Sequence, residues 1–308
     1  MAIASLPKLD GARTLRARRR LGSRWWIPWL FLFPALVLAL YFKFIPIVDA
    51  IIMSFEKVRP YLGNTWIGME NYETLFADPL FVQSIGHAAI MTVASTFGAI
   101  VVGFVLALLL EGPARHVAIV RAAAFLPVVV PMAVVAELWR ILYYPAPDGA
   151  LNSILGILGI GTSPFISSSS TALASIIVVT VWQGAPYNML IILAGLVGVD
   201  RALYEASALD GVNRLQRIRY VVLPSLKPVF VILFTLAAIR GLRVFTEVFL
   251  LTDGGPDAST EVPMTYIYRT GLTSNDLGTA SAGAIVLFAA TLILTGLVLA
   301  ISRRKAKS

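Results

Sequence analysis

The sequence predicts an all-α integral membrane protein with six transmembrane helices. Of its 308 residues, 58% are hydrophobic and only 14% are charged, which lies far outside the averages of soluble domains. Apolar runs long enough to cross a bilayer also alternate with short polar segments. The chain has no cysteine, so disulfides and thiolate metal sites are excluded. Its net charge of +8 does not indicate nucleic-acid binding, because the basic residues cluster beside the apolar runs, as membrane topology requires.

The N-terminal region is predicted to be a basic tail followed by one span and a loop. Residues 1–24 hold a single acid, Asp10, among seven basic residues. The apolar run that follows is too long for a signal peptide and has no small-residue cleavage site, so we expect an uncleaved tail. A first span at about 25–54 opens on a tryptophan belt. The loop that completes region 25–83 carries a short amphipathic helix at 71–76.

Region 84–302 is predicted to hold the other five spans. We place them at about 84–110, 117–141, 172–197, 229–251 and 279–302. The third contains Pro127 and Pro131, which predict a kink, and Glu137 and Arg140 lie one turn apart at a spacing that allows an ion pair. Residues 303–308 form a second basic tail.

The distribution of basic residues predicts the topology. Six spans place both termini on one side of the membrane. Arginine and lysine concentrate in the N-terminal tail, in the segment 203–228 and at the C-terminus, whereas 142–171 has none. By the positive-inside rule the three basic regions, and so both termini, are cytoplasmic.

The segment 203–228 is predicted to be a helix-turn-helix that lies on the cytoplasmic membrane surface. Leu203, Ala206 and Leu209 recur at helical spacing before Gly211, which offers a helix end. Asn213 can cap a second helix, whose apolar positions lie roughly on one side. Residues 224 and 228 are prolines that end the segment. The alternative is an interfacial loop that merely joins two spans.

The sequence carries no catalytic or nucleotide-binding motif. No G-x-x-x-x-G-K-[ST] run and no H-E-x-x-H run is present. The two histidines, His87 and His116, are far apart, which leaves no plausible Ser-His-Asp set and argues against a metal site. We therefore expect this chain not to be an enzyme and to bind no cofactor of its own.

Two of the predicted spans hold polar residues that a lipid-facing helix would not tolerate. In the fifth predicted span, Arg240, Arg243 and Glu247 fall within an arc of about 60° at about 100° per residue. Such an arc should face a polar interior, because a mid-membrane arginine costs roughly 2.5–3.5 kcal/mol. It predicts either a translocation path or an Arg243–Glu247 ion pair that locks helices together.

The fourth span adds a second polar group. Gln183, Tyr187 and Asn188 surround Pro186 and combine hydrogen-bonding groups with aromatic surface, a mixture that suits sugars. The alternative role is polar contact between packed helices.

The segment 203–228 resembles the EAA loop in the membrane subunits of ATP-binding cassette (ABC) importers. That pattern is Glu-Ala-Ala, two residues, Asp-Gly-Ala and then, at a fixed distance, an apolar residue and Leu-Pro. The corresponding residues are Glu205-Ala206-Ser207, Asp210-Gly211-Val212, Val221, Leu223-Pro224, Leu226 and Pro228. Ser207 and Val212 replace the usual alanines with other small residues.

From residue 25 onward, the chain also resembles the first permease of maltose-type, multiple-sugar importers. The stretches that carry the likeness are Phe33-Pro34 to Ser54-Phe55, Gly68–Tyr72, Phe125–Pro127, Trp139-Arg140 leading to Gly149–Asn152, Trp182–Asn188 with Ala194–Leu196, and Phe245 to Leu251–Pro256 with Tyr266–Tyr268. One departure is Thr246, which stands where many relatives have aspartate.

This resemblance implies a type I ABC importer membrane domain that forms half of a translocation path in the inner membrane. A second six-helix permease, two cytoplasmic subunits that bind ATP and magnesium, and an external solute-binding protein would complete the transporter. The residues implied in ATPase coupling are Glu205, Ala206, Asp210, Gly211, Leu223 and Pro224. Neutral di- or oligosaccharides are the expected cargo, with an anionic solute such as a glycerol phosphate ester as an alternative. An ion-gradient-driven secondary transporter is the alternative class.

Overall fold

The computed structural model describes residues 26–59, 61–241 and 243–305. The predicted tail 1–24 and the last residues of the second tail lie outside this range. The chain divides into two compact units, Met1–Asp49 and Ala50–Ser308. Within the described residues the structure is helical, apart from an antiparallel pair of short strands, β1 (Glu56–Lys57) and β2 (Thr65–Trp66).

The N-terminal helical run matches the predicted first span. It consists of α1 (Ile27–Ala39), the π-helical turn η1 (Leu40–Phe44) and α2 (Ile45–Met53), which reaches into the second unit. Pro46 is the second residue of α2 and has no N–H to donate to the preceding turn, so a shift of the hydrogen-bond ladder just before it is expected. The run 27–53 is long and apolar enough to cross a membrane.

The second unit contains three more helices that are long and apolar enough to cross a membrane. They are α4 (Pro79–Leu109), α8 (Ala172–Val197) and α15 (Leu277–Lys305). Two bent pairs raise the number of candidate spans in the described chain from four to six, if each pair counts as one span. Counted in this way, the candidate spans agree in number with the six predicted.

The first bent pair confirms the predicted kink of the third span. Helices α5 (Arg115–Val129) and α6 (Met132–Leu142) meet at 98°, and Pro131 is the N-cap residue of α6. The predicted ion pair is present, with 3.7 Å between Arg140 Nη1 and Glu137 Oε2.

The second bent pair corrects the predicted fifth span. The segment Arg214–Ser225 meets α12 (Lys227–Gly241) at 64°, and the helix does not continue to residue 251. It ends at Gly241, and a separate short helix, α13 (Thr246–Leu251), follows a non-helical stretch. The apolar pattern continues across this break, which is why composition alone predicted one helix.

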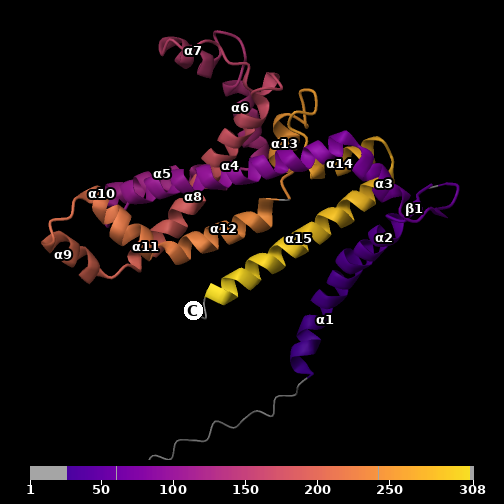
Figure 1. Cartoon of the computed structure of the whole chain (residues 1–308), viewed down its shortest axis with the longest axis horizontal. Coiled ribbons are helices and arrows are strands. Elements are labelled where there is room, and N and C mark those ends of the chain that lie inside the picture. Colours follow the sequence, from indigo (N-terminus) through magenta and orange to yellow (C-terminus); the bar gives the residue numbers. More distant parts are fainter. Residues whose placement is uncertain (1–25, 60, 242, 306–308) are drawn as a thin grey trace, which may run out of the picture. The chain divides into compact units, whose positions relative to one another are not determined.

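Helices α4 and α8 pack along each other and form the centre of the second unit (Figure 1). Glycines bring their backbones close, as small residues do in membrane helix pairs. A Cβ atom on Gly103 would lie 2.8 Å from the Ala185 carbonyl oxygen, and one on Gly98 would lie 2.7 Å from Val181 Cγ2. This close contact along the middle of α4 and α8 determines which residues of the two helices face each other.

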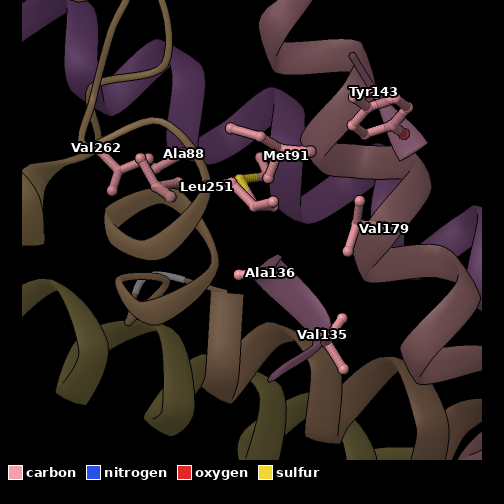
Figure 2. Close-up of a cluster of buried hydrophobic side chains, with 10 residues drawn as sticks. Ala88, Met91, Val135, Ala136, Tyr143, Val179, Leu251 and Val262 are labelled. Carbon is pink, nitrogen blue, oxygen red and sulfur yellow. The ribbon is translucent and has the colours of Figure 1, made fainter. Parts of the chain in front are cut away.

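Two buried apolar clusters flank the middle of this pair. In the first, Met91 and Val179 from the two long helices meet side chains from α6 and α13, as Figure 2 shows. The second joins the opposite halves of α4 and α8 to α12, and its members are Ile100, Ala107, Met189, Ile192, Leu193, Leu196, Val222, Leu226 and Leu233.

Short helices connect and cover these spans. The predicted amphipathic helix at 71–76 is present as α3 (Glu70–Ala77). The others are α7 (Ala150–Ile157), the 3₁₀ turn η2 (Phe165–Ser167), α9 (Arg201–Leu209), α10 (Arg214–Arg217), the π-helical turn η3 (Ile218–Val222), α11 (Leu223–Ser225), α14 (Pro263–Tyr268) and the π-helical turn η4 (Arg269–Thr273).

Candidate functional site

A cavity of about 610 Å³ lies beside the middle of the α4–α8 pair. Its lining residues begin beyond the first apolar cluster and extend to the edge of the second. The volume falls within the range of about 300–1,000 Å³ that is usual for small-molecule sites. Because both helices are long enough to cross the membrane, a cavity at their middle corresponds to the interior of the bilayer.

The two long helices contribute the same periodic pattern to the cavity wall. Each lines it at positions i, i+3, i+4, i+7 and i+8, which is one face of an α-helix. The ten residues are Thr92, Ser95, Thr96, Ala99 and Ile100 from α4, with Thr180, Gln183, Gly184, Tyr187 and Asn188 from α8. This wall is neutral, and most of its polar groups are hydroxyls and amides.

The end of α12 and the break that follows it line another side of the cavity. Gly241 is buried against Thr92 of α4, where any Cβ atom would clash with the threonine side chain. The Thr92 hydroxyl lies 2.9 Å from the Gly241 carbonyl oxygen. Past this contact the Arg243 N–H donates to the Arg240 carbonyl oxygen at 2.9 Å. The chain thus turns beside the cavity, and Arg240, Arg243 and Glu247 all line it.

The structure therefore brings together all six residues predicted for the substrate path: Gln183, Tyr187, Asn188, Arg240, Arg243 and Glu247. Arg240, Arg243 and Glu247 lie across a helix break and not on one helical arc, which corrects the predicted geometry. Within the described residues no ion pair joins Arg243 to Glu247, so the alternative of a helix-locking pair finds no support. That these six side chains touch a solute stays a prediction.

Sequence reasoning missed the contribution of α4. Thr92, Ser95 and Thr96 line the cavity, and their spacing of i, i+3 and i+4 in an otherwise apolar span was a readable signal of a polar helix face. Hydroxyls at helical spacing are also common where helices merely pack, so the pattern alone does not identify a cavity.

A second candidate site is the helical hairpin formed by residues 201–225. Asp200 is the N-cap residue of helix α9, and its side chain accepts from the Ala202 N–H at 2.9 Å. It is followed by a turn in which Gly211 has φ +69°, a left-handed conformation that favours glycine. Asn213 and Gln216 then form a capping box at the start of α10. The predicted helix-turn-helix is confirmed in these details, since two capped helices flank the glycine turn.

Tyr204 and Ser207 attach the hairpin to the rest of the chain. Tyr204 packs against the second apolar cluster, with the Arg217 guanidinium 5.9 Å from its ring centre. Burial raises the pKa of the Tyr204 hydroxyl, the Glu111 carboxylate adds to this, and Arg217 opposes it. Ser207 is buried and its hydroxyl donates to the Tyr204 carbonyl oxygen. One side of α9 is therefore anchored.

The other side of the hairpin is exposed, although it is partly apolar. Leu209 and Leu215 are 89% and 76% exposed, and Leu203 is also exposed. All six residues predicted for ATPase coupling lie on the exposed surface: Glu205, Ala206, Asp210, Gly211, Leu223 and Pro224. The first four belong to α9 and its turn, whereas the last two begin α11, directly after the η3 segment that packs against α9.

These features define a class of protein. A helical membrane chain with a polar cavity at the middle of its spans and an exposed hairpin at their ends fits a transport permease that works with other subunits. Comparison with known proteins identifies the family. The chain matches the model of "binding-protein-dependent transport system inner membrane component" over residues 24–307, and it belongs to this family.

Individual relatives agree with the family match. The chain is 31% identical to the multiple sugar-binding transport system permease protein MsmF of Streptococcus mutans, covering 93% of this chain and 98% of that one. It is 31% identical to the sulfoquinovosyl glycerol transport system permease protein SmoG of Agrobacterium fabrum, covering 90% of each. A bacterial ABC transporter that imports the acidic polysaccharide alginate matches with a TM-score of 0.79 and 26% identity, covering 91% and 96%.

Family membership establishes several predictions. The chain is a multi-pass inner-membrane permease with type I ABC importer architecture, in a system that depends on a solute-binding protein. It is a non-catalytic subunit, and ATP is bound by a separate ATPase subunit. An ion-gradient-driven secondary transporter is thereby set aside.

Proposed function

We propose that this chain is the permease subunit of an ATP-driven carbohydrate importer and forms half of its translocation path. The observation that carries the proposal is the cavity at the middle of α4 and α8, lined by Gln183, Tyr187, Asn188 and the two arginines. Amides and hydroxyls can exchange hydrogen bonds with sugar hydroxyls, and an aromatic ring can cover a sugar face. The relatives named for sugars, arabinooligosaccharides and trehalose or maltose support the same cargo class.

The hairpin at 201–225 is proposed to dock in a cytoplasmic ATPase. Its exposed leucines would be buried by a partner, since an exposed apolar patch commonly marks an interaction site. Glu205 and Asp210 are exposed beside them and would meet basic groups, while Gly211 provides the turn. This assignment places the hairpin and both termini in the cytoplasm, in agreement with the positive-inside rule.

The proposed assembly contains a second, homologous permease and two ATP-binding subunits. In this chain Arg240, Arg243 and Thr246 are exposed although they line the cavity. A second permease placed against that side would enclose the path between two chains. The chain's own regions would then be a tail at 1–24, a first span and loop at 25–83, the permease core at 84–302 and a tail at 303–308.

Transport by the reconstituted complex tests this function. The chain would be purified with its cognate second permease, ATPase and binding protein, and placed in proteoliposomes. Radiolabelled maltotriose, arabinotriose and a uronic-acid trisaccharide would be offered, with histidine and methionine as non-saccharide controls. We expect ATP-dependent uptake of at least one saccharide and of neither amino acid.

A matched pair of variants tests the role of the cavity. Gln183→Leu removes a hydrogen-bonding group from the cavity and should lower saccharide uptake roughly three- to tenfold. Gln83→Leu makes the same change at an exposed position of α4 outside the cavity and should leave uptake unchanged. Uptake of an amino acid alone, uptake without ATP, or equal effects of the two variants would contradict the proposal.

A further inference from the structure

The cavity has few charged residues, and the positive ones outnumber the negative ones. Within the described residues its lining includes two arginines, Arg240 and Arg243, and a single carboxylate, Glu247. The ion pairs of the described chain lie elsewhere, at Arg140–Glu137 and Arg269–Glu261. Both cavity guanidinium groups are thus free of a carboxylate partner in the described part of this chain, and the cavity carries a net positive charge.

The fold positions the backbone that carries the two arginines. Arg240 lies over the ring of Tyr187, with 5.5 Å between the guanidinium carbon and the ring centre, a cation–π contact that orients the group. Arg243 follows three residues later, and its backbone N–H donates to the Arg240 carbonyl oxygen at 2.9 Å. Gly241 between them is buried against Thr92. Both arginines therefore extend from a packed backbone turn, while their side chains are exposed on the side of the cavity.

The placement of these charges needs a reason. Arginine is expensive to keep at mid-membrane depth, and such residues usually mark a solute or ion pathway. A neutral sugar requires hydrogen bonds that the amides and hydroxyls of α4 and α8 already supply. A planar guanidinium has a donor geometry that matches carboxylate, sulfonate or phosphate oxygens.

We propose that the cavity is adapted to a saccharide or glycoside that carries an anionic group, which Arg240 and Arg243 bind while α4 and α8 contact its hydroxyls. This inference rests on the proposed carbohydrate path and narrows its substrate class. Carboxylate, sulfonate and phosphate share the chemistry that the two arginines recognise, and the test separates them.

Equilibrium binding to the assembled complex in nanodiscs tests the inference. The probes are methyl α-glucoside and its three anionic relatives, the methyl glucuronide, the 6-phosphate and the 6-sulfonate. We expect at least one anionic probe to bind roughly tenfold or more tightly than the neutral glucoside. Arg240→Gln and Arg243→Gln should each reduce that preference by roughly tenfold to a hundredfold.

Control variants separate substrate binding from other roles of the arginines. Arg140→Gln removes an arginine of α6 outside the cavity and should leave the preference unchanged. Arg240→Lys keeps the charge but loses the planar donor group, and should restore part of the preference. If the arginines instead pair with acids of the second permease, the glutamine variants will impair assembly and leave the preference of the assembled complex intact, which would overturn the inference.

ATP-dependent uptake by the same assembled complex tests the proposed carbohydrate import separately from the preference for anionic probes. ATP-dependent uptake of neutral saccharides, with no preference for anionic probes and no effect of Arg240→Gln, would overturn the inference and leave the carbohydrate importer standing. Failure of all anionic probes to bind also overturns it. Failure of every saccharide to be imported would count against the carbohydrate function itself.

Discussion

The α4–α8 pair and the hairpin at 201–225 differ in how far their apolar side chains are exposed. In the pair, Met91, Ile176 and Met189 are fully buried, and glycines let the helices approach closely. In the hairpin, Leu209 and Leu215 are 89% and 76% exposed, although the local structure is well defined by a capping box and a glycine turn. One region buries its apolar side chains within the chain, and the other is a well-formed surface that leaves them exposed.

This difference separates stability from assembly. Substitutions between α4 and α8 should change the free energy of unfolding, because burial and close packing supply that stability. Substitutions on the outer side of the hairpin should leave the fold unchanged and affect association with another subunit. The cavity lies beside the stable pair, so its lining is positioned by packing that does not depend on the hairpin.

The largest expected effect is that of Leu209→Asp on ATPase binding. A charge placed at the centre of an apolar contact should weaken association by about 2 kcal/mol or more, which is roughly 30-fold, and should reduce transport to background. Ile157→Asp is the matched control, because Ile157 is 85% exposed in α7, outside the hairpin. Co-purification of the ATPase and thermal unfolding of the permease are measured for both.

If Leu209→Asp lowers the unfolding temperature as much as it lowers ATPase binding, the hairpin is part of the structural core and the distinction fails. The same conclusion follows if ATPase binding survives the substitution unchanged.

A smaller effect is expected for Gly103→Val in the α4–α8 pair. The Cβ atom of the new side chain would lie 2.8 Å from both the Ala185 carbonyl oxygen and Asn188 Cβ, and overpacking of this kind costs about 1–3 kcal/mol. Gly86→Val makes the same change on α4 where nothing lies within 4 Å and should have little effect. Unfolding in mixed micelles with increasing SDS compares the two, and equal losses would show that close packing is not the cause.

The structural features that the sequence predicts correctly are those determined by residues close together in the chain. The fourth span is found at Ala172–Val197 as predicted, because polar and turn residues flank a single apolar run. The hairpin turn at Gly211 and the cap at Asn213 follow from side-chain and backbone chemistry within a few residues. The bend near Pro131 is likewise local.

The break after Gly241 could not be read in this way. The apolar pattern continues to Leu251, and the helix ends where Gly241 packs against Thr92, a residue 149 positions away in the chain. All six residues predicted for the substrate path line the cavity, but Arg240, Arg243 and Glu247 lie across a helix break and not on one helical arc. The α4 wall, with Thr92, Ser95 and Thr96, was missed because only tertiary packing shows which polar helix faces meet.

The smallest expected effect belongs to Gly211→Ala, which alters the hairpin without adding or removing a contact. A Cβ atom at Gly211 would have nothing within 4 Å, but its φ of +69° is left-handed, so the cost is conformational and about 1 kcal/mol. We expect ATPase binding to persist while the number of solute molecules moved per ATP hydrolysed falls a few-fold, because the turn that positions Glu205 and Asp210 relaxes. Gly156→Ala in α7, with open space and no left-handed φ, is the control. An unchanged transport ratio for Gly211→Ala would mean that the exposed apolar side chains alone, and not the turn geometry, carry the communication between the hairpin and the ATPase.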